Sequence, residues 1–560
     1  MKTTILQSSI ETLEPRIAPA AIFVNATTAT YKDVDGDAVT VKFTKPILTS
    51  GNVGGVLVTT PLGLGDQLRT IDLATPGITV SAVGTNIVVS VKLAPLTGDG
   101  LANVGAIKAI GIDLGAVSVK GDLGMIDAGN ATTTTPGLKS LAVQSLGRFG
   151  TTTGAPDLES DITGALSVLI VRSDIVGAFI NVTGGADGKI GALTVGSSLL
   201  GGATLRAGAI YATGNIGPVK IGGNIEGGDG EATGQIRSTT GKIVSLTLGG
   251  SLLGGGGTDS GQITSFRDMG AVKIGGDIRA TDADATGSIF SAGIASVTLG
   301  GSLIGGANFD TGKIIAFGNM GAVKIGGSII GASASGSNAF DSSGYIQGDR
   351  IASLYVGGSI ITGVDNSSGD LTNNGSVRTE FDIGSVTIKG SLIGHTSASG
   401  DTPVIISARG QEQHGVTTNV AIGKISIGGR VDHALILAGY EENLIALNGD
   451  AQIGAVTVAG DWIASSLVAG ATNTTSGNRF FGNGGDALIS GGSAAIQAKI
   501  ASITIGGQVL GTIGGTDQFG FVAEQIGLLK VAGTLIPLKP AAHVDNRAIG
   551  PVGDMALHEI

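Results

Sequence analysis

Residues 269–331 read MGAVKIGGDIRATDADATGSIFSAG (269–293), IASVTLGGSLIGGANFDTGKIIAFGN (294–319) and MGAVKIGGSIIG (320–331). The phrase apolar-x-x-apolar-x-apolar-Gly-Gly-x-apolar opens each of these three pieces. A repeat of about 25 residues is typical of solenoid proteins, in which each repeat contacts its neighbours along one axis. Copies of the phrase begin at Ile190, Ile216, Ile243, Met269, Ile294, Met320, Ile351, Ile383, Ile422, Ile453, Ile500 and Ile526.

Each copy of the phrase predicts two short strands that meet at a glycine corner. Val323 and Ile325 fall on one face of the first strand and Lys324 falls on the other, which is the two-residue period of a β-strand. Gly326-Gly327 follows, and we expect positive φ angles at this corner because glycine adopts them without strain. A third apolar piece, such as residues 312–317, precedes many copies.

Three strands and three turns in about 26 residues match one coil of a parallel β-helix. We therefore predict an all-β fold, a right-handed parallel β-helix with a β-rich N-terminal cap. An array of β-sandwiches is the alternative. Helices are excluded because a glycine pair would cost each helix around 2 kcal/mol, and because the apolar period is two instead of 3.6.

The outward position of the main strand alternates between lysine and threonine over several copies. In a parallel stack this position lies directly above its equivalent in the previous coil, and like charges in contact are destabilising. Alternation doubles the Lys–Lys distance to roughly 10 Å, about one Debye length. The row reads Thr194, Lys220, Thr247, Lys273, Thr298, Lys324, Tyr355 and Thr387.

Composition excludes several classes of protein. Glycine makes up 99 of the 560 residues without an every-third pattern, which excludes collagen, and 42% hydrophobic residues exclude disorder. The net charge of −11, with no Lys/Arg cluster, argues against nucleic acid as a partner. Cysteine is absent, so no disulfide or Cys-based zinc site is expected. No apolar run reaches about 18 residues, so no transmembrane helix is predicted.

The repeats divide the chain into four predicted parts. Residues 1–22 form a targeting segment, and residues 23–100 form a β-rich cap over the apolar end of the stack. Residues 101–538 form the repeat array. Residues 539–560 form a C-terminal cap or tail.

The first segment contains a short motif near its end. It starts with Lys2 and contains the small-residue sequence Ala18-Pro19-Ala20, but it lacks the continuous apolar core of a Sec signal. Residues Leu13-Glu14-Pro15-Arg16 resemble the LEPR-type motif of large secreted or surface proteins in planctomycete and verrucomicrobial bacteria. In that family two leucines usually follow, whereas Ile17-Ala18 follow here. The resemblance implies export to the extracellular space or cell surface and implies no activity.

Three aspartates at alternate positions, Asp33, Asp35 and Asp37, surround the dipeptide Asp35-Gly36. Extended runs on both sides predict a hairpin with a turn at this place. The spacing also resembles the start of a calcium loop, but an EF-hand needs Glu at its twelfth position, where Thr44 stands. We favour a turn, with calcium as the alternative, and predict no other cofactor. Gly-Asp turns elsewhere in the array are interpreted as solvated turns.

The densest polar region lies at residues 409–443, within one of the longer repeats. If the chain acted on acidic polysaccharides, carboxylates paired with arginines on one wall would be needed. The candidates for this chemistry are Glu412, Asp432, Glu441, Arg409 and Arg430. The favoured interpretation is an ordinary polar insert, so no catalytic, cofactor-binding or metal residue is assigned.

The histidines and aromatic residues of the C-terminal half carry weaker signals. His395, His414 and His433 are spaced 19 residues apart, which does not match the local coil lengths and is treated as coincidence. Four aromatic residues are candidates for a sugar-stacking patch, although core or turn positions are favoured for them. They are Trp462, Tyr440, Phe480 and Phe481.

These observations predict a non-enzymatic secreted or cell-surface β-solenoid with a structural or adhesive role. Extracellular glycans or other surface proteins are its expected partners. The alternative is a polysaccharide lyase or hydrolase of the parallel β-helix type, with its site near residues 409–443. A polar groove that crosses three or more coils would favour a specific site over a purely structural role.

Overall fold

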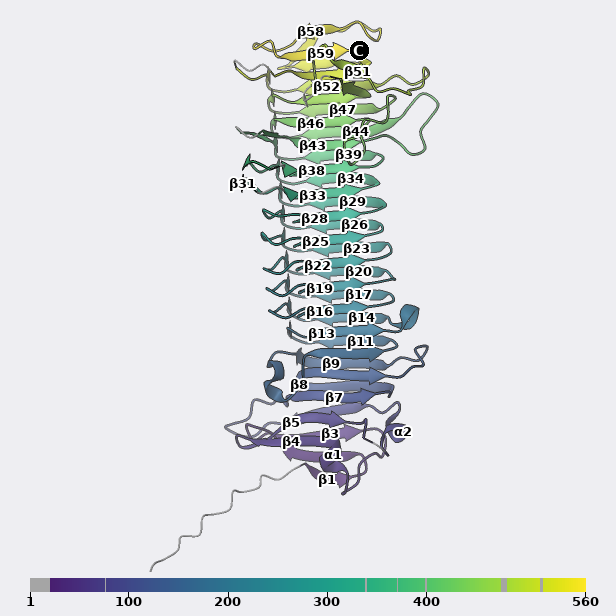
Figure 1. Ribbon diagram of the computed structural model, residues 1–560, viewed down its shortest axis with the longest axis vertical. Coiled ribbons are helices and arrows are strands. Elements are labelled where there is room, and N and C mark those ends of the chain that lie inside the picture. Colours follow the sequence, from purple (N-terminus) through teal and green to yellow (C-terminus); the bar gives the residue numbers. More distant parts are fainter. Residues whose placement is uncertain are drawn as a thin grey trace, which may run out of the picture.

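The computed structural model describes residues 21–560 except residues 76, 338–339, 370, 398–399, 475–480 and 514–516. The chain forms a rod in which the coils stack along one axis (Figure 1). About half of the residues are in strands and about 3% in helices, and the coils form a parallel β-solenoid of about 15 turns, spaced about 28 residues apart. The predicted all-β solenoid is confirmed. The LEPR-like motif lies outside the described residues.

The strand of the repeated phrase forms the longest wall of the rod, here called wall A. Val272 pairs with Val297 and Val297 with Val323, all three pointing into the core. Its strands include β8 (Leu114–Gly129), β9 (Leu138–Leu146), β11 (Leu166–Val171), β14 (Ile190–Val195), β17 (Ile216–Ile221), β20 (Ile243–Leu248), β23 (Met269–Ile274), β26 (Ile294–Leu299), β29 (Asn319–Ile325), β34 (Arg350–Val356), β39 (Ile383–Ile388), β44 (Val420–Ile427), β47 (Gln452–Val458) and β52 (Lys499–Ile505).

The outward row of wall A is in register as the Lys/Thr pattern predicts. Lys273 pairs with Thr298, and Thr298 pairs with Lys324. At the next coil the Nζ of Lys324 lies 5.8 Å from the centre of the Tyr355 ring, so an aromatic face replaces threonine as the neighbour of this charge. The alternation therefore separates the lysines by one whole coil.

Strands of two residues form wall B, which follows wall A after the glycine corner. One residue of each pair points into the core and the other outward. The strands are β12 (Ile175–Val176), β15 (Leu199–Leu200), β18 (Ile225–Glu226), β21 (Leu252–Leu253), β24 (Ile278–Arg279), β27 (Leu303–Ile304), β30 (Ile329–Ile330), β35 (Ile360–Ile361), β40 (Leu392–Ile393), β45 (Val431–Asp432), β48 (Trp462–Ile463) and β53 (Val509–Leu510).

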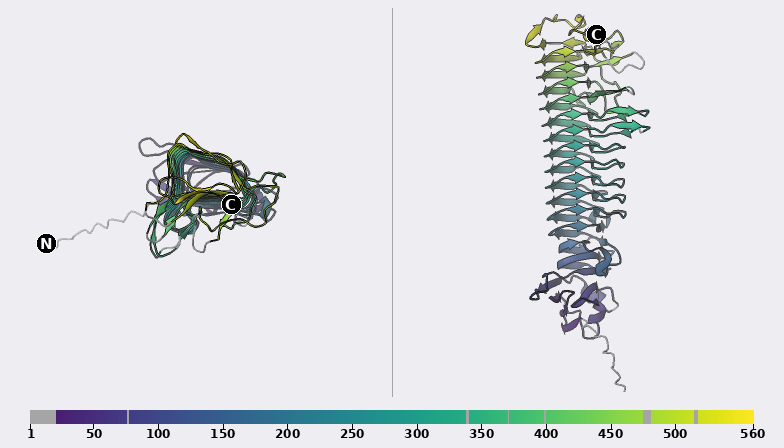
Figure 2. Two further views of the ribbon diagram at one scale, coloured as in Figure 1. Left: turned by 90° about the horizontal axis from the view of Figure 1, so that it is seen from above. Right: turned by 90° about the vertical axis from the view of Figure 1, so that its left-hand side faces the viewer.

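Wall C closes the coil and leads into the next strand of wall A. Seen along the axis, the coils superpose in a common outline (Figure 2). The strands are β10 (Glu159–Thr163), β13 (Phe179–Thr183), β16 (Ala209–Ala212), β19 (Gln235–Ser238), β22 (Gln262–Ser265), β25 (Ser288–Ser291), β28 (Lys313–Ala316), β33 (Tyr345–Gly348), β38 (Ser376–Thr379), β43 (Val404–Ala408), β46 (Ala434–Ala438), β49 (Ser466–Ala469), β54 (Phe519–Ala523) and β59 (Met555–Glu559).

The glycine pair stands at the corner between walls A and B, but the reason given for it by the sequence is wrong. Neither Gly326 nor Gly327 has a positive φ. A Cβ on Gly326 would lie 2.2 Å from the carbonyl oxygen of Gly300 in the coil below, so close stacking requires the missing side chain. The positive φ occurs at the turn before wall C, where Gly312 has a φ of +58°.

A ladder of short polar side chains follows the glycine pair from coil to coil. The Oγ of Ser302 accepts a hydrogen bond from the backbone N–H of Ser328 at 3.0 Å. Ser328 accepts in turn from Ser359 at 3.1 Å, and Ser359 from Ser391 at 3.0 Å. These bonds satisfy backbone donors at a corner where the regular strand ladder is interrupted. Side-chain oxygens thereby continue the stacking through the bend.

Antiparallel strands form the N-terminal end of the rod (Figure 1). The elements are β1 (Ile22–Asn25), β2 (Thr28–Lys32), β3 (Ala38–Phe43), α1 (Val53–Val56), β4 (Leu57–Leu62), β5 (Gly65–Asp72), α2 (Thr79–Ala82), β6 (Ile87–Lys92) and β7 (Val104–Ile110). The predicted hairpin is formed by β2 and β3, which pair antiparallel up to Lys32 and Ala38. Strands β5 and β6 then pair in parallel with β7 and β8, so this end continues directly into the first coils.

Inserts between walls build extra structure on the later coils. Two pairs of short strands stack in parallel outside the coils, β31 (Ala334–Gly336) with β36 (Asp365–Ser367) and β32 (Phe340–Asp341) with β37 (Leu371–Thr372). Two pairs are antiparallel, β41 (His395–Thr396) with β42 (Asp401–Thr402) and β50 (Ala471–Asn473) with β51 (Asp486–Leu488).

The C-terminal end adds one more strand to wall C. Strand β59 pairs in parallel with β54 and antiparallel with β58 (Asn546–Ala548). The remaining strands of this end are β55 (Gln525–Ile526), β56 (Leu529–Val531) and β57 (Thr534–Ile536). Among the helices of the described residues, none has the length and apolar character needed to cross a bilayer.

Candidate functional site

A cavity of about 470 Å³ lies against the outer face of wall C, where the inserts are longest. It is lined by residues from β37 and β38, from the start of β43, from β46 and the loop after it, and from β50. Residues from four coils, Leu371 to Phe481, therefore meet at one place. A cavity of this size accommodates a small ligand.

A change in the outer row of wall C creates this cavity. In the middle of the rod the outward residues of this row are mixed, but from β43 onward Ile405, Leu435, Leu437 and Val468 point outward and are buried. They form a second, smaller hydrophobic core with Tyr440, whose hydroxyl donates to the carbonyl of Ala471 at 2.8 Å. Long inserts are needed to cover this apolar face. The cavity lies beside the covered face, toward the coil of β37 and β38.

Amide and hydroxyl groups make up much of the polar lining. Asn373 has a left-handed backbone, with φ of 51°, and its Oδ1 is buried without a hydrogen-bond partner among the described residues. Asn374 is structural, because its Oδ1 accepts from the N–H of Gly363 and its Nδ2 donates to the carbonyl of Ala332, both at 2.7 Å. Asn443 and Thr472 complete this side of the cavity. Asn373 therefore lines the cavity with an amide whose oxygen accepts no hydrogen bond from the described residues.

Charged side chains from three successive coils gather beside the cavity. The Nη1 of Arg409 lies 2.6 Å from the Oε1 of Glu380. Carboxylate oxygens of Glu380, Glu441 and Glu442 lie within 4.8 Å of one another. Arg378, which lines the cavity and is buried, donates from Nη1 to the main-chain oxygen of Glu442 at 3.1 Å. A polar group thus crosses three coils just after the ends of the wall C strands β38, β43 and β46, the arrangement that favours a specific site.

The crowding of these carboxylates changes the protonation of Glu380. Burial and the neighbouring Glu442 carboxyl raise the pKa of Glu380 to about 7, against the opposing effect of the Arg409 guanidinium. The Oε2 of Glu442 is buried and has no hydrogen-bond partner in the part of the chain that is described. A proton on Glu380 would supply the missing donor.

The structure separates the residues that the sequence groups at 409–443. Arg409 and Glu441 belong to the charged group beside the cavity. Asp432 lies at the other end of β46, beyond its five residues or about 16 Å of extended chain. Glu412 is exposed on the insert after β43 and lines a separate small hollow with Arg350. The five candidates therefore do not form one catalytic group.

Asp432 is held by its own neighbours. The Nε of Arg430 lies 3.0 Å from its Oδ2, and the Nδ1 of His433 lies 2.7 Å from its Oδ1. Burial opposes ionisation, but the hydrogen bond from His433 and the charge of Arg430 outweigh it, so the pKa of Asp432 stays below its usual value. The other histidines have separate surroundings: His395 Nδ1 lies 3.4 Å from Thr362 Oγ1, and exposed His414 contacts the carbonyl of Gly415.

The aromatic candidates do not form a surface patch for sugar stacking. Trp462 is fully buried inside the solenoid, where it contacts Phe521 edge-on at 5.1 Å. Tyr440 and Phe481 are buried in the second core and line the cavity from that side. Phe480 lies outside the described residues. Packing is thus the role of the three described rings, as the favoured interpretation predicts.

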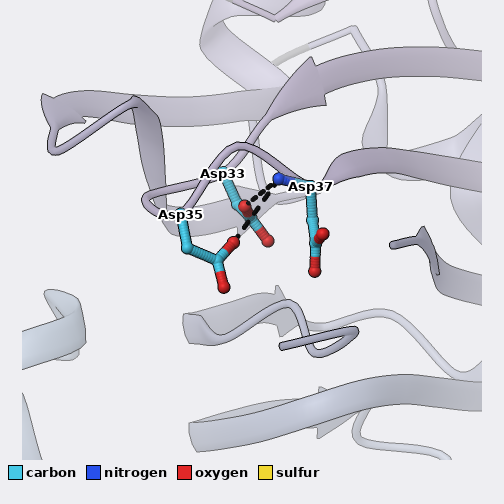
Figure 3. A group of neighbouring side chains, drawn as sticks. All are labelled: Asp33, Asp35 and Asp37. Atoms are coloured by element: carbon cyan, nitrogen blue, oxygen red, sulfur yellow. Dashed lines mark hydrogen bonds between the residues drawn. The ribbon is translucent and has the colours of Figure 1, made fainter. Parts of the chain in front are cut away.

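The three aspartates of the first hairpin lie with their carboxylates on the same side of the turn (Figure 3). Their oxygens are within 4.8 Å of one another. The N–H of Asp37 donates to Asp33 Oδ1 at 2.8 Å, the N–H of Asp99 to Asp35 Oδ2 at 2.8 Å, and the N–H of Gly100 to Asp37 Oδ2 at 2.7 Å. The carboxylates thus tie the turn to the segment after β6. Calcium binding here stays a prediction.

The Asp33→Asn variant tests this interpretation by its pH dependence. Burial and the Asp35 carboxyl raise the pKa of Asp33 to about 7, so its contribution to stability is present in acid and lost as pH rises through about 7. The amide keeps the acceptor for Asp37 N–H and removes the charge. We expect hydrogen-exchange protection of residues 28–43 to equal the wild type near pH 5 and exceed it several-fold near pH 8.

Asp229→Asn, at an exposed position, is the control. It should leave the hydrogen-exchange protection of residues 28–43 unchanged both near pH 5 and near pH 8. The contrary result is that Asp33→Asn loses hydrogen-exchange protection near pH 8, and that added calcium restores protection in the wild type only. That result would show that a bound ion holds the turn and that the backbone hydrogen bonds to the carboxylates are insufficient.

Sequence reasoning missed Glu380, Glu442, Arg378 and Asn373. The signal that could have found them is the alignment of coils, because Arg378 pairs with Gln347 below and Ser407 above on the outer row of wall C. No family model, curated protein or solved structure matches this chain.

Proposed function

We propose that this chain is a non-enzymatic, secreted or cell-surface solenoid that serves as a rigid spacer and binds carbohydrate in the wall C cavity. The observation that carries the proposal is the cavity itself. Most loops of the middle coils only connect one wall to the next. The inserts that follow β37 instead cover the apolar outer face of wall C and enclose a cavity with polar side chains in its lining. The export signal suggested by Leu13-Glu14-Pro15-Arg16 supports the location.

The lining matches the chemistry of a sugar. Sugar hydroxyls both donate and accept, and side-chain amides and hydroxyls such as Asn373, Asn443 and Thr472 do the same. The C–H faces of a sugar need apolar contacts, which Leu371, Ile405 and Leu435 supply. Buried Arg378 adds a fixed cation, which favours a sugar acid such as a uronate over a neutral sugar.

The alternative is a polysaccharide lyase or hydrolase. The observation that favours it is the group of carboxylates beside the cavity, where the pKa of Glu380 is raised to about 7, the range suited to a general acid. Against it, Asp432 lies at the far end of β46 and is paired with Arg430 and hydrogen-bonded to His433. Asp432→Ala should therefore leave any activity unchanged, and turnover would have to depend on Glu380.

The Asn373→Gly variant tests the binding site with little effect on folding. Glycine suits the left-handed backbone of this position, so only the amide is lost. We expect affinity for a uronate-containing oligosaccharide, measured by calorimetry on a panel that also contains neutral oligosaccharides, to fall about tenfold, the value of about 1.4 kcal/mol for a lost polar contact.

The Ser342→Gly variant is the matched control. Ser342 has a φ of 62° at the equivalent position one coil below, and it does not line the cavity. Its affinity should equal that of the wild type. Equal affinity of wild type and Asn373→Gly for every bound sugar would place the binding site elsewhere.

A further inference from the structure

One loop carries both the cavity wall and two of the three clustered glutamates. Tyr440, Asn443 and Leu444 line the cavity, and Glu441 and Glu442 stand between them. The loop is closed by its own hydrogen bonds, from the N–H of Glu441 to the carbonyl of Ile445 at 3.2 Å and from the N–H of Leu444 to the carbonyl of Glu441 at 3.0 Å. The start of the loop is anchored separately, by the N–H of Gly439 to the carbonyl of Ala408 at 2.9 Å and by the Tyr440 hydroxyl to Ala471. Glu442 therefore holds residues 441–445, which bring Asn443 and Leu444 to the cavity.

Glu442 is the point at which this loop meets the coils below. Its main-chain oxygen accepts from Arg378 at 3.1 Å, and its carboxyl approaches that of Glu380 within the cluster. The Oε2 of Glu442 is buried and has no donor among the described residues. Two carboxyl groups in contact are favourable when one of them carries a proton and unfavourable when both are charged.

We propose that a proton shared between Glu380 and Glu442 latches residues 441–445 of the loop over the cavity, so that sugar binding is regulated by pH. This inference rests on the proposed function of the cavity, but the latch itself is a property of the loop. Protonated, the Glu380 carboxyl donates to Glu442 and the wall is closed. Deprotonated, the two carboxylates repel each other and the loop separates from the coil.

The charged groups around Glu380 set the range of this switch. Arg409, from the coil above, pairs with Glu380 and favours its ionised form. Glu441 and Glu442, from the loop, oppose ionisation. Asp349, from the coil below, faces Glu442 and Glu412. Its pKa is raised, mainly by burial and to a smaller extent by the charges of these two glutamates. Arg378 remains the cation beside Glu442 on the cavity side.

The direction of the pH effect follows from these neighbours. The pKa of Glu380 is raised to about 7 in the closed form, above the usual value of a glutamate. Its contribution to closure is therefore complete in acid and is lost as pH rises through about 7. The latch is closed in mildly acidic surroundings and released in alkaline ones.

Hydrogen exchange of residues 441–445 in the full chain, without any sugar and corrected for intrinsic exchange, tests the latch. We expect protection of the wild type to fall at least tenfold between about pH 5 and about pH 8. Glu380→Gln places a permanent hydrogen-bond donor against Glu442. Its protection at both pH values should therefore equal that of the wild type at about pH 5. Glu231→Gln, which removes an exposed glutamate on a distant coil, should retain the wild-type fall.

Equal protection of the wild type at both pH values, or a fall that persists in Glu380→Gln, would overturn the latch. Protection that survives near pH 8 but disappears in EDTA would assign closure to a bound cation and would also overturn it. Failure of the proposed function looks different: no oligosaccharide binds at about pH 5, while the exchange of the loop still follows the latch.

Discussion

Gly312→Ala is expected to destabilise the middle of the rod by about 2–5 kcal/mol. Gly312 has a φ of +58°, which costs an L-residue about 1–2 kcal/mol. A Cβ would also lie 2.4 Å from the carbonyl oxygen of Ile304 and 2.7 Å from the Cα of Gly305, and backbone atoms cannot move aside as a flexible side chain can. Overpacking of this kind costs about 1–3 kcal/mol more.

The damage should spread to neighbouring coils, because each coil is stabilised by the two that it contacts. Hydrogen exchange of β25, β28 and β33 measures the effect. Gly185→Ala is the matched control: Gly185 has a φ of +61° and open space around its Cα, so this variant reports the backbone cost alone. Equal effects of the two variants would show that coil stacking does not demand glycine at position 312.

Trp462→Ala should cost about 3–5 kcal/mol, the usual range for removing a buried tryptophan. The side chain is fully buried in wall B, stacked between Val431 below and Val509 above. Its Nε1 donates to the carbonyl of Ser465 at 2.9 Å, so truncation also leaves that acceptor without a donor. Denaturant unfolding followed by circular dichroism measures the loss.

Trp462→Leu is the control, because leucine and valine occupy this position of wall B in neighbouring coils. It should recover part of the loss, since leucine refills much of the cavity. Trp462 is also the only tryptophan of the chain, so its fluorescence reports this site directly. Ready quenching of that fluorescence by iodide in the folded protein would contradict the burial described for it.

The solenoid could be predicted from sequence because each coil repeats the same local choice. Met269, Ile294 and Met320 are the first residues of three successive copies of the phrase. Met269 pairs with Ile294 and Ile294 with Met320, in the register that the repeat predicts. A period-two strand and a tight corner depend on neighbouring residues only. The corner shows the limit: the sequence identified Gly326-Gly327, but the contact with Gly300 that requires glycine comes from the coil below.

The candidate site was harder to predict because its residues come from different coils. Arg378, Arg409 and Glu442 are each about 30 residues apart, and inserts of unequal length separate them. Grouping by proximity in the chain placed Asp432 with Glu441, whereas β46 separates them. The second core was invisible for the same reason, since Ile405, Leu435 and Val468 only become a surface when three coils are stacked.

The most direct test of the proposed function is to incubate the purified full chain with a panel of neutral and uronate-containing oligosaccharides and to follow both retention and chain length. We predict that a uronate-containing oligosaccharide is retained near pH 5 by the wild type and by Ser342→Gly, is retained less by Asn373→Gly, and keeps its length throughout. Shortened products that depend on Glu380, or no retention of any oligosaccharide, would contradict a non-enzymatic carbohydrate-binding solenoid.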